Sequence, residues 1–472
     1  MNEVFASDGW LNAVITAIND ALWTYLLIGV LIVCAFWFTW RSRFVQFRML
    51  GEMLRLLGES TGRHDGERHI SSFQAFAVSV ATRVGTGNLA GVATAIAVGG
   101  PGAVFWMWLI ALFGSATAFV ESTLAQLFKQ RSVDSFIGGP AYYIRRGLKK
   151  PWLANLFAVL LTLTFGLAYN SVQSNTICGA MDKAFGLPPL YVGLFLVVIS
   201  LTVIFGGIQR IARVSSVVVP VMALGYFVLA LVVVVMNIGQ LPSVFRLIIE
   251  DAFGIRQVAG GGFGMVMMMG IKRGLFSNEA GEGSAPNVAA TASTSHPVKQ
   301  GLIQALGVFT DTLLVCSCTA FIILCSGIST TSGLNGIALT QTALETQVGA
   351  FGPIFIAIAI FLFAYSSIIG NYYYGEANIR YLTSRRWVMT LYRLCSGGLV
   401  VLFGALASLD LVWSIGDLFM ALLTATNLLA VVFLAKYAFR LLDDYRHQKR
   451  EGISSPTFHR SQLPELELDC WE

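Results

Sequence analysis

Residues 79–91 read SVATRVGTGNLAG and interrupt an apolar segment that is otherwise suited to cross a membrane as a helix. A second apolar segment, in the other half of the chain, is interrupted at residues 274–284 by GLFSNEAGEGS. Lipid offers no hydrogen bonds to an unwound backbone, so such breaks are tolerated only where they are buried in protein or line a cavity. Two broken helices at matching places in two halves of a chain are typical of secondary transporters that bind substrate at the breaks.

The composition indicates an integral membrane protein. Hydrophobic residues make up 56% of the chain and charged residues only 12%, with a mean hydropathy of +0.70, whereas soluble domains carry about 25% charged residues. The net charge of +5 arises from basic loops and does not indicate a nucleic-acid partner. Apolar stretches of about 18 residues or more mark membrane-spanning helices. We expect eleven of them: 21–40, 72–98, 103–128, 153–180, 188–206, 214–236, 263–291, 301–326, 352–375, 388–407 and 411–438.

Lysine and arginine residues are concentrated in alternate loops, and this pattern predicts the orientation of the chain. Basic loops are retained on the cytoplasmic side of a membrane. Here the basic residues lie in loops 41–71 and 129–152, around Arg210 and Arg213, at 380–386 and after Ala435. We therefore expect the N-terminus outside and the C-terminus in the cytoplasm. The polar residues 441–472 are expected to form a partly disordered tail without a catalytic role.

The order of the predicted spans indicates an internal repeat. Residues 1–71 hold one span and a basic loop, and residues 72–236 and 263–438 hold five spans each. Residues 237–262 form an extracellular connection, and residues 439–472 form the cytoplasmic tail. The first five-helix unit begins with a broken helix that enters from the cytoplasm, and the second begins with one that enters from outside. We therefore expect an all-α membrane protein with a LeuT-type 5+5 inverted repeat, preceded by one additional N-terminal span.

The first break carries groups suited to a zwitterionic amino acid. Gly85 and Gly87 let the backbone approach a ligand closely, while Thr86 and Asn88 add a hydroxyl group and an amide. Free helix N-termini attract a carboxylate, and helix C-termini or loose carbonyl groups attract a cation. The alternative interpretation is a kink filled by ordinary packing. The second break, at 274–284, makes that alternative less attractive because it repeats the same glycine and polar pattern.

A site for a co-transported cation is also predicted at the first break. The carbonyl groups of Ala81 and Val84 and the hydroxyl groups of Ser366 and Ser367 would form an oxygen-only site suited to Na⁺. The first broken helix has no carboxylate to carry a proton, because no Asp or Glu occurs from 74 to 119. The alternative role of the serine pair is hydrogen bonding between helices.

Two further residues are candidates for the substrate pocket. Gln173 in the fourth span would present an amide, and Met268 belongs to a methionine cluster before the second break. Interhelical hydrogen bonding and ordinary packing are the respective alternatives. A channel would need a continuous polar lining or charged rings, which the sequence lacks. An enzyme is not expected either, because the chain contains no HExxH and no paired His/Asp cluster.

Charged residues near the breaks allow more than one interpretation. Ionisable groups at membrane depth are costly and usually face the protein interior, as we expect for Asp311. Arg83 and Glu279 form either a gate or a structural ion pair, and the sequence does not separate these roles. For Lys272 and Arg273 we favour structural ion pairs or contact with the cytoplasmic side. Proton coupling through Glu279 or Lys272 is the alternative to Na⁺ coupling.

Several motifs together resemble the alanine or glycine:cation symporter family, the sodium:alanine symporters. The resemblance extends over about 20 to 440 and rests on GGPGAVFWMW at 99–108 with Gly114, FSNEAGEGSAPN at 276–287, GTGNLAG at 85–91, GPAYY at 139–143 and NIGQLP at 237–242. It implies Na⁺-coupled, or in some members H⁺-coupled, uptake of small neutral amino acids on a LeuT-like fold. Together with the compact loops it also implies a multi-pass protein of the prokaryotic inner membrane.

The resemblance assigns roles to individual residues. Thr86, Gly87 and Asn88 would hold the main-chain groups of the substrate, and Gln173 matches a glutamine that faces the substrate. The pair 366–367 matches a serine or threonine pair near the sodium site.

One position departs from the family pattern. Many relatives carry tryptophan where this chain has Asn371. A tryptophan there would cap a small pocket, whereas asparagine leaves more room and adds an amide. The expected partners are therefore a small neutral amino acid such as alanine or glycine, Na⁺ and membrane lipid, with glutamine as the alternative substrate. The oligomeric state is not predicted.

Overall fold

The computed structural model describes residues 10–59, 71–132, 136–206, 208–255, 262–328 and 332–471. Residues 60–70 of the predicted basic loop, and the side chains of Arg210 and Arg213, lie outside this description. The described chain is almost entirely helical.

The first half contains helices α2 (Trp10–Leu22), η1 (Trp23–Leu27), α3 (Ile28–Arg41), α4 (Val45–Arg48), α5 (Leu50–Leu57), α6 (Ser72–Arg83), η2 (Gly87–Gly91), α7 (Val92–Thr94), η3 (Ala95–Gly99), α8 (Ala103–Leu127), α9 (Pro140–Gly147), α10 (Pro151–Leu163), η4 (Thr164–Tyr169), α11 (Asn170–Phe185), α12 (Pro189–Ile204) and α13 (Ile208–Met236). Two short strands, β1 (Gln130–Arg131) and β2 (Phe136–Ile137), pair antiparallel between α8 and α9.

The second half contains η5 (Ile238–Gln240), α14 (Leu241–Ala252), α15 (Phe263–Asn278), α16 (Ala285–Ala289), α17 (Pro297–Val308), η6 (Phe309–Cys316), α18 (Ser317–Cys325), α19 (Gly336–Val348), α20 (Phe351–Leu382), α21 (Arg386–Leu394), η7 (Cys395–Leu399), α22 (Val400–Leu406), α23 (Leu409–Arg450) and η8 (Arg460–Gln462).

Seven helices of the described chain are long and apolar enough to cross a membrane. They correspond to seven of the eleven predicted spans. The other four predicted spans are broken, short or bent. The 72–98 and 263–291 spans are interrupted by their breaks, Pro189–Ile204 is a shorter apolar helix, and the end of α13 forms a bent pair with the following helix. The total of eleven therefore remains a prediction.

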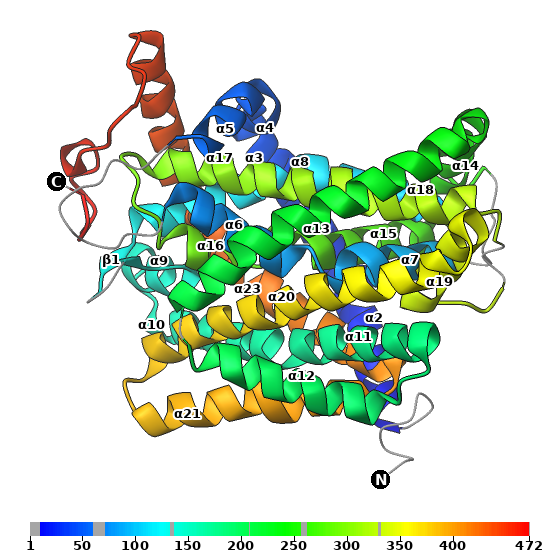
Figure 1. The fold of residues 1–472 in the computed structure, drawn as a ribbon. Helices are drawn as coiled ribbons and strands as arrows, with labels where there is room; N and C mark the ends of the chain where they lie inside the picture. Colours follow the sequence, from blue (N-terminus) through cyan, green and yellow to red (C-terminus); the bar gives the residue numbers. More distant parts are fainter. Residues whose placement is uncertain are drawn as a thin grey trace.

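The two broken helices lie in the middle of the bundle (Figure 1). Helix α8 packs on both α15 and α17, and α20 packs on α6 and α11. In Figure 1, α4, α5, α9 and the C-terminus gather at one end of the bundle, while α14 and α19 lie at the opposite end. We call the first of these the basic end, because it carries Lys129, Arg145, Arg146 and Arg380.

The C-terminal segment is ordered and packed, so the prediction of a partly disordered tail was wrong. Helix α23 continues to Arg450, and the segment 451–471 then folds back onto the basic end. Phe458 and Trp471 are buried, and the Trp471 indole donates hydrogen bonds to the carbonyl groups of Gln126 and Leu127. The polar composition of the tail concealed apolar side chains, of which Phe458 and Trp471 pack edge to face, with ring centres 5.4 Å apart, in one buried cluster.

Candidate functional site

The first break is a short unwound segment between two helices, as the sequence predicted. Helix α6 ends at Arg83, and Val84 is extended, with φ −75° and ψ 98°. A Cβ atom on Gly85 would collide with Ser367 Oγ and lie 3.0 Å from the Gln173 amide oxygen. Glycine is therefore required here because two other helices approach the backbone closely.

The second break changes direction through left-handed backbone conformations. Helix α15 ends at Asn278, and the next residue, Glu279, has φ of 56°. Gly281 and Gly283 follow with φ of 98° and 78°, a region that glycine enters without strain. A Cβ atom on Gly87 of the first break would lie 3.0 Å from the Cα atom of Ser277. The two breaks therefore touch through their backbones.

A buried network of hydrogen bonds joins the two breaks. The Asn88 side chain donates to Asp311 Oδ1 (2.7 Å) and to Ser277 Oγ (3.1 Å), and it accepts from the Gly85 backbone N–H (2.8 Å). Ser277 in turn donates to Asp311 Oδ2 (2.5 Å). Sequence reasoning placed Asp311 only in the bundle interior. A carboxylate within an apolar span was the available signal that it has a specific partner.

Five oxygen atoms converge between the first break and α20. Ser367 Oγ lies 3.1 Å from the Ala81 carbonyl oxygen, 3.4 Å from that of Val84 and 3.1 Å from that of Phe363. Ser366 Oγ lies 3.3 Å from the Ala81 carbonyl oxygen and 2.7 Å from that of Phe363. The structure thus brings together all four residues predicted for the cation site. It adds the Phe363 carbonyl group, which the sequence could not reveal because a backbone oxygen leaves no mark on residue type.

Two polar side chains near these oxygens have no hydrogen-bond partner among the described residues. Thr86 Oγ1 is buried without a hydrogen bond, although the Thr86 backbone N–H donates to Gln173 Oε1 (3.0 Å). Both polar atoms of the Asn371 amide are also buried without a partner, and that residue is 1% exposed. Leaving a buried polar group unsatisfied costs about 1–3 kcal/mol. These atoms are therefore available to a polar ligand.

Met268 lies apart from the other predicted site residues. Its sulfur atom contacts Thr24 Oγ1 of the N-terminal span at 3.9 Å. Ten residues separate it from Asn278 at the end of the same helix, which corresponds to about 15 Å along a helix axis. The structure therefore does not bring Met268 to the breaks.

A cavity of about 300 Å³ opens at the end of the bundle opposite the basic end, and its lining includes Arg273, Trp413 and Asp417. Arg273 donates to both carboxylate oxygens of Asp417 (3.0 and 2.8 Å) and stacks over the Trp413 ring at 4.1 Å. The Trp413 ring lies 4.7 Å from the ring of Phe276, which reaches Gly87. These side chains close the path from the cavity to the breaks.

Arg83 and Glu279 do not pair with each other, and Lys272 and Arg273 share a partner that the sequence did not indicate, Asp417. Lys272 also pairs with Asp417 (3.3 Å), so the prediction of structural ion pairs for Lys272 and Arg273 agrees with the geometry. Arg273 and Asp417 line the cavity of about 300 Å³ described above. Arg83 donates instead to the Gln304 carbonyl group (3.2 Å), and Glu279 accepts from Ser284 (2.6 Å).

Comparison with known proteins identifies the family. The model of the sodium:alanine symporter family matches residues 8–460. The chain is 51% identical to the "probable sodium/glutamine symporter GlnT" of Bacillus subtilis, over 98% of this chain and 96% of that protein. It is 48% identical to the "amino-acid carrier protein AlsT" of the same organism, over 98% of both chains.

The fold is similar to that of a protein of known structure. The crystal structure of MhsT in complex with L-phenylalanine aligns with a TM-score of 0.56 and 14% identity, over 80% of this chain and 99% of that one. This likeness confirms the predicted LeuT fold. Together with the apolar helices, the comparisons show that the chain is a multi-pass membrane transporter of amino acids, not an enzyme, and that it belongs to the sodium:alanine symporter family.

Proposed function

We propose that this protein couples the uptake of a neutral amino acid to Na⁺, by alternating access. The observation that carries the proposal is the cluster of five oxygen atoms from α6, the first break and α20, next to buried polar groups that lack a partner. Unwound carbonyl groups at a helix break coordinate Na⁺ in transporters of this architecture.

The donor set favours Na⁺ over a proton. Carbonyl and hydroxyl oxygens suit a hard cation, but none of them can take up a proton near neutral pH. The two residues considered for proton coupling already have other partners in the protein. Lys272 pairs with Asp417, and Glu279 accepts a hydrogen bond from Ser284. Ala81, Val84, Phe363, Ser366 and Ser367 would therefore hold Na⁺.

The first break is suited to the main-chain groups of the substrate. The helical segment Gly87–Gly99 begins at the break, and a helix N-terminus favours a carboxylate. Gly85 and Gly87 let the neighbouring helices and the second break approach the backbone closely, the Thr86 hydroxyl group has no hydrogen-bond partner among the described residues, and Gln173 orients the Thr86 amide. Asn88 is engaged with Asp311 and Ser277, so its contribution is to hold this geometry.

Two substrate classes are candidates. The family name points to alanine, and glycine shares its small size. Glutamine is the second candidate, and Asn371 is the observation that favours it. An unpartnered asparagine amide can exchange a hydrogen-bond pair with the amide of a glutamine side chain, and a relative with 51% identity is named as a probable sodium/glutamine symporter.

The membrane arrangement and the repeat are part of the same proposal. The basic end would face the cytoplasm of the inner membrane, with the N-terminus outside. Residues 72–236 and 263–438 would form the two inverted repeats, with 1–71 before them, 237–262 between them and 439–472 after them. Arg273 and Asp417 would then form an outer gate that closes over the bound substrate.

Uptake into proteoliposomes tests the proposal. Radiolabelled L-alanine and L-glutamine would be supplied with and without an inward Na⁺ gradient, using the wild type, Ser367→Ala and the control Ser200→Ala. Ser200 is also a buried serine but lies on α12, away from the breaks. We expect Na⁺-dependent uptake that Ser367→Ala abolishes and Ser200→Ala preserves. Uptake that persists without Na⁺ and collapses with the pH gradient would instead establish proton coupling.

A further inference from the structure

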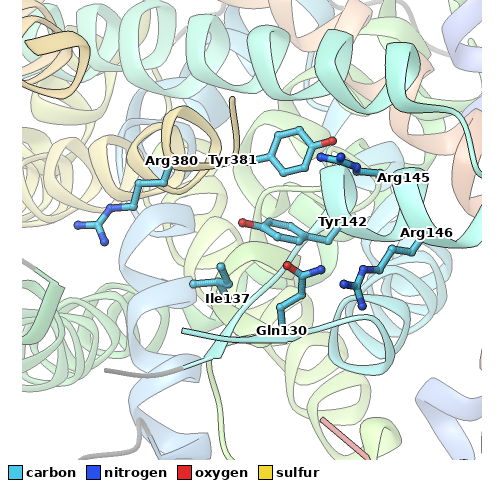
Figure 2. A pocket seen from close by; sticks show the side chains of 7 residues that line it. All are labelled: Gln130, Ile137, Tyr142, Arg145, Arg146, Arg380 and Tyr381. Atoms are coloured by element: carbon cyan, nitrogen blue, oxygen red, sulfur yellow. The ribbon is translucent and has the colours of Figure 1, made fainter. Parts of the chain in front are cut away.

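A second cavity, of about 450 Å³, lies at the basic end between α9, the β1–β2 hairpin and the end of α20 (Figure 2). Arg145, Arg146 and Arg380 surround it, together with the phenol rings of Tyr142 and Tyr381. It is separate from the breaks, and the transport site described above uses none of these side chains. We call it the arginine pocket.

The arginine pocket carries an excess of positive charge. Arg380 pairs with Glu376 (2.5 Å), which is shared with Arg393 (3.5 Å). Arg146 pairs with Asp469 of the C-terminal segment (2.7 Å). Arg145 forms no ion pair with any residue in the described part of the chain, and its guanidinium group lies 5.9 Å from the centre of the Tyr381 ring.

Neutral hydrogen-bond donors accompany the arginines. The Tyr381 hydroxyl group is buried and has no hydrogen-bond partner within the part of the chain that the structure describes. Its ring meets that of Tyr142 edge to face, with centroids 5.1 Å apart. Burial raises the pKa of Tyr142 to about 12, so its hydroxyl group keeps its proton at neutral pH. Among the described residues, Arg145 therefore has no ion-pair partner and the Tyr381 hydroxyl group has no acceptor, so both can donate to a ligand.

We propose that the arginine pocket binds a phosphate group. Guanidinium groups bind phosphate oxygens through paired, charge-assisted hydrogen bonds, and the two phenol groups would donate to the remaining oxygens. Asp469 already supplies one carboxylate to Arg146, which shows that the site accepts an anion at its rim. A phosphate ligand would compete with that contact.

The phosphate group can come from a phospholipid or from a soluble anion. Trp152 and Trp387 begin the helices next to the pocket and are 64% and 62% exposed. Exposed tryptophans mark the level of lipid headgroups, and basic pockets between helices at this level bind anionic headgroups. The position therefore favours phosphatidylglycerol or a similar lipid as the source.

The arginine pocket is connected to both parts of the transport site. Arg380 and Tyr381 lie on α20, the helix that carries Ser366 and Ser367. On α9, Tyr143 follows Tyr142 and donates to Asn427 (2.5 Å), which donates to the Gly281 carbonyl group of the second break (2.8 Å). Occupation of the pocket would therefore be transmitted to the elements that bind the ion and the substrate.

The test measures binding directly, so it does not depend on the transport assay. Purified protein would be placed in nanodiscs of phosphatidylcholine alone or with phosphatidylglycerol, with and without inorganic phosphate. Lipid retention would be measured by native mass spectrometry and thermal stability by intrinsic fluorescence. We expect Arg145→Gln to weaken binding about tenfold, the loss expected for one charge-assisted hydrogen bond. Arg386→Gln, an exposed arginine at the same end, is the matched control.

The outcomes separate the two sources and can overturn the proposal. Stabilisation by phosphatidylglycerol alone identifies a lipid site, and stabilisation by inorganic phosphate identifies a soluble anion. No stabilisation of the wild type by either probe, or equal losses in Arg145→Gln and Arg386→Gln, would refute a specific site. Tyr381→Phe removes only the hydroxyl group and provides a second, less disruptive variant, for which we also expect weaker binding.

Discussion

Asn88 on the first break and Asp311 on η6 are joined by a 2.7 Å hydrogen bond, although 223 positions separate them in the chain. Ser277 on the second break bonds to both of them. One carboxylate therefore holds together the two helix breaks. A buried carboxylate without its donors is costly, so each of these residues depends on the others.

Asn88→Ala should abolish amino-acid uptake. The substitution removes the donor to Asp311 and the acceptor of the Gly85 backbone N–H, so both the carboxylate and the unwound segment lose support. Uptake in proteoliposomes measures the effect, and size-exclusion chromatography of the purified variant checks that it is folded. Normal uptake by this variant would show that the tie between the breaks is dispensable.

Gly85→Ala should also prevent uptake, for a steric reason. The added methyl group would collide with Ser367 Oγ and crowd the Gln173 amide. It would therefore displace one side chain of the proposed ion site and one of the proposed substrate site. Gly29→Ala is the control, because its methyl group would enter open space on α3. We expect Na⁺-dependent uptake to remain in the control only. Equal activity of the two variants would contradict the close approach seen at Gly85.

Asp417→Asn should destabilise the protein. Arg273 and Lys272 would lose their buried counter-charge, and removing one partner of a buried ion pair costs about 3–5 kcal/mol. The thermal unfolding temperature of the purified protein measures the loss. Glu250→Gln breaks the exposed pair with Arg246 and should change stability little, because surface pairs contribute about 0–1 kcal/mol. A similar decrease in both variants would argue against a special role for the buried pair.

Asn371→Trp should narrow the substrate range. We expect the bulky ring, placed where the unpartnered amide is buried, to exclude a long side chain. We expect glutamine uptake to fall well below alanine uptake in this variant, as measured by competition against a fixed radiolabelled substrate. If glutamine transport survives the substitution, the pocket for the side chain must lie elsewhere.

Acid should release α5 from α23. Burial by itself would raise the pKa of Glu52, but hydrogen bonds from Arg55 and Tyr445 outweigh it and lower the pKa to about 2. A carboxylate with a lowered pKa stabilises the folded state above its ordinary value of 4.5, and this contribution is lost as the pH falls toward 2. Hydrogen exchange of residues 50–57 should therefore accelerate over this range. Glu52→Gln should exchange faster already at neutral pH and show a weaker dependence on pH.

The breaks and the oxygen cluster at Ser366 and Ser367 could be predicted because their signals are local or chemically simple. Glycines beside polar residues in an apolar segment permit few structures in a membrane, and this predicted the unwound segment at Gly85. Ser366 and Ser367 were singled out as adjacent hydroxyl residues within an apolar span and by the family resemblance. The convergence of their oxygen atoms with the Ala81 carbonyl group agrees with this expectation.

Other features depend on which segments meet, and composition does not carry that information. Asp417 pairs with Arg273 across 144 positions, and no local pattern names such a partner. Met268 was predicted to line the substrate pocket because it precedes the second break. In the structure it instead contacts Thr24 of the N-terminal span. The C-terminal segment looked polar on average, whereas single apolar residues such as Trp471 decide how it packs.

The contact between Gly87 and Ser277 leaves no room for a side chain between the two breaks. Neither broken helix can therefore tilt or shift at its centre without pushing on the other. The two broken helices are therefore coupled at the place where the proposed substrate would bind. A substitution that enlarges either residue should stiffen both halves of the molecule together and slow every step in which the site changes sides.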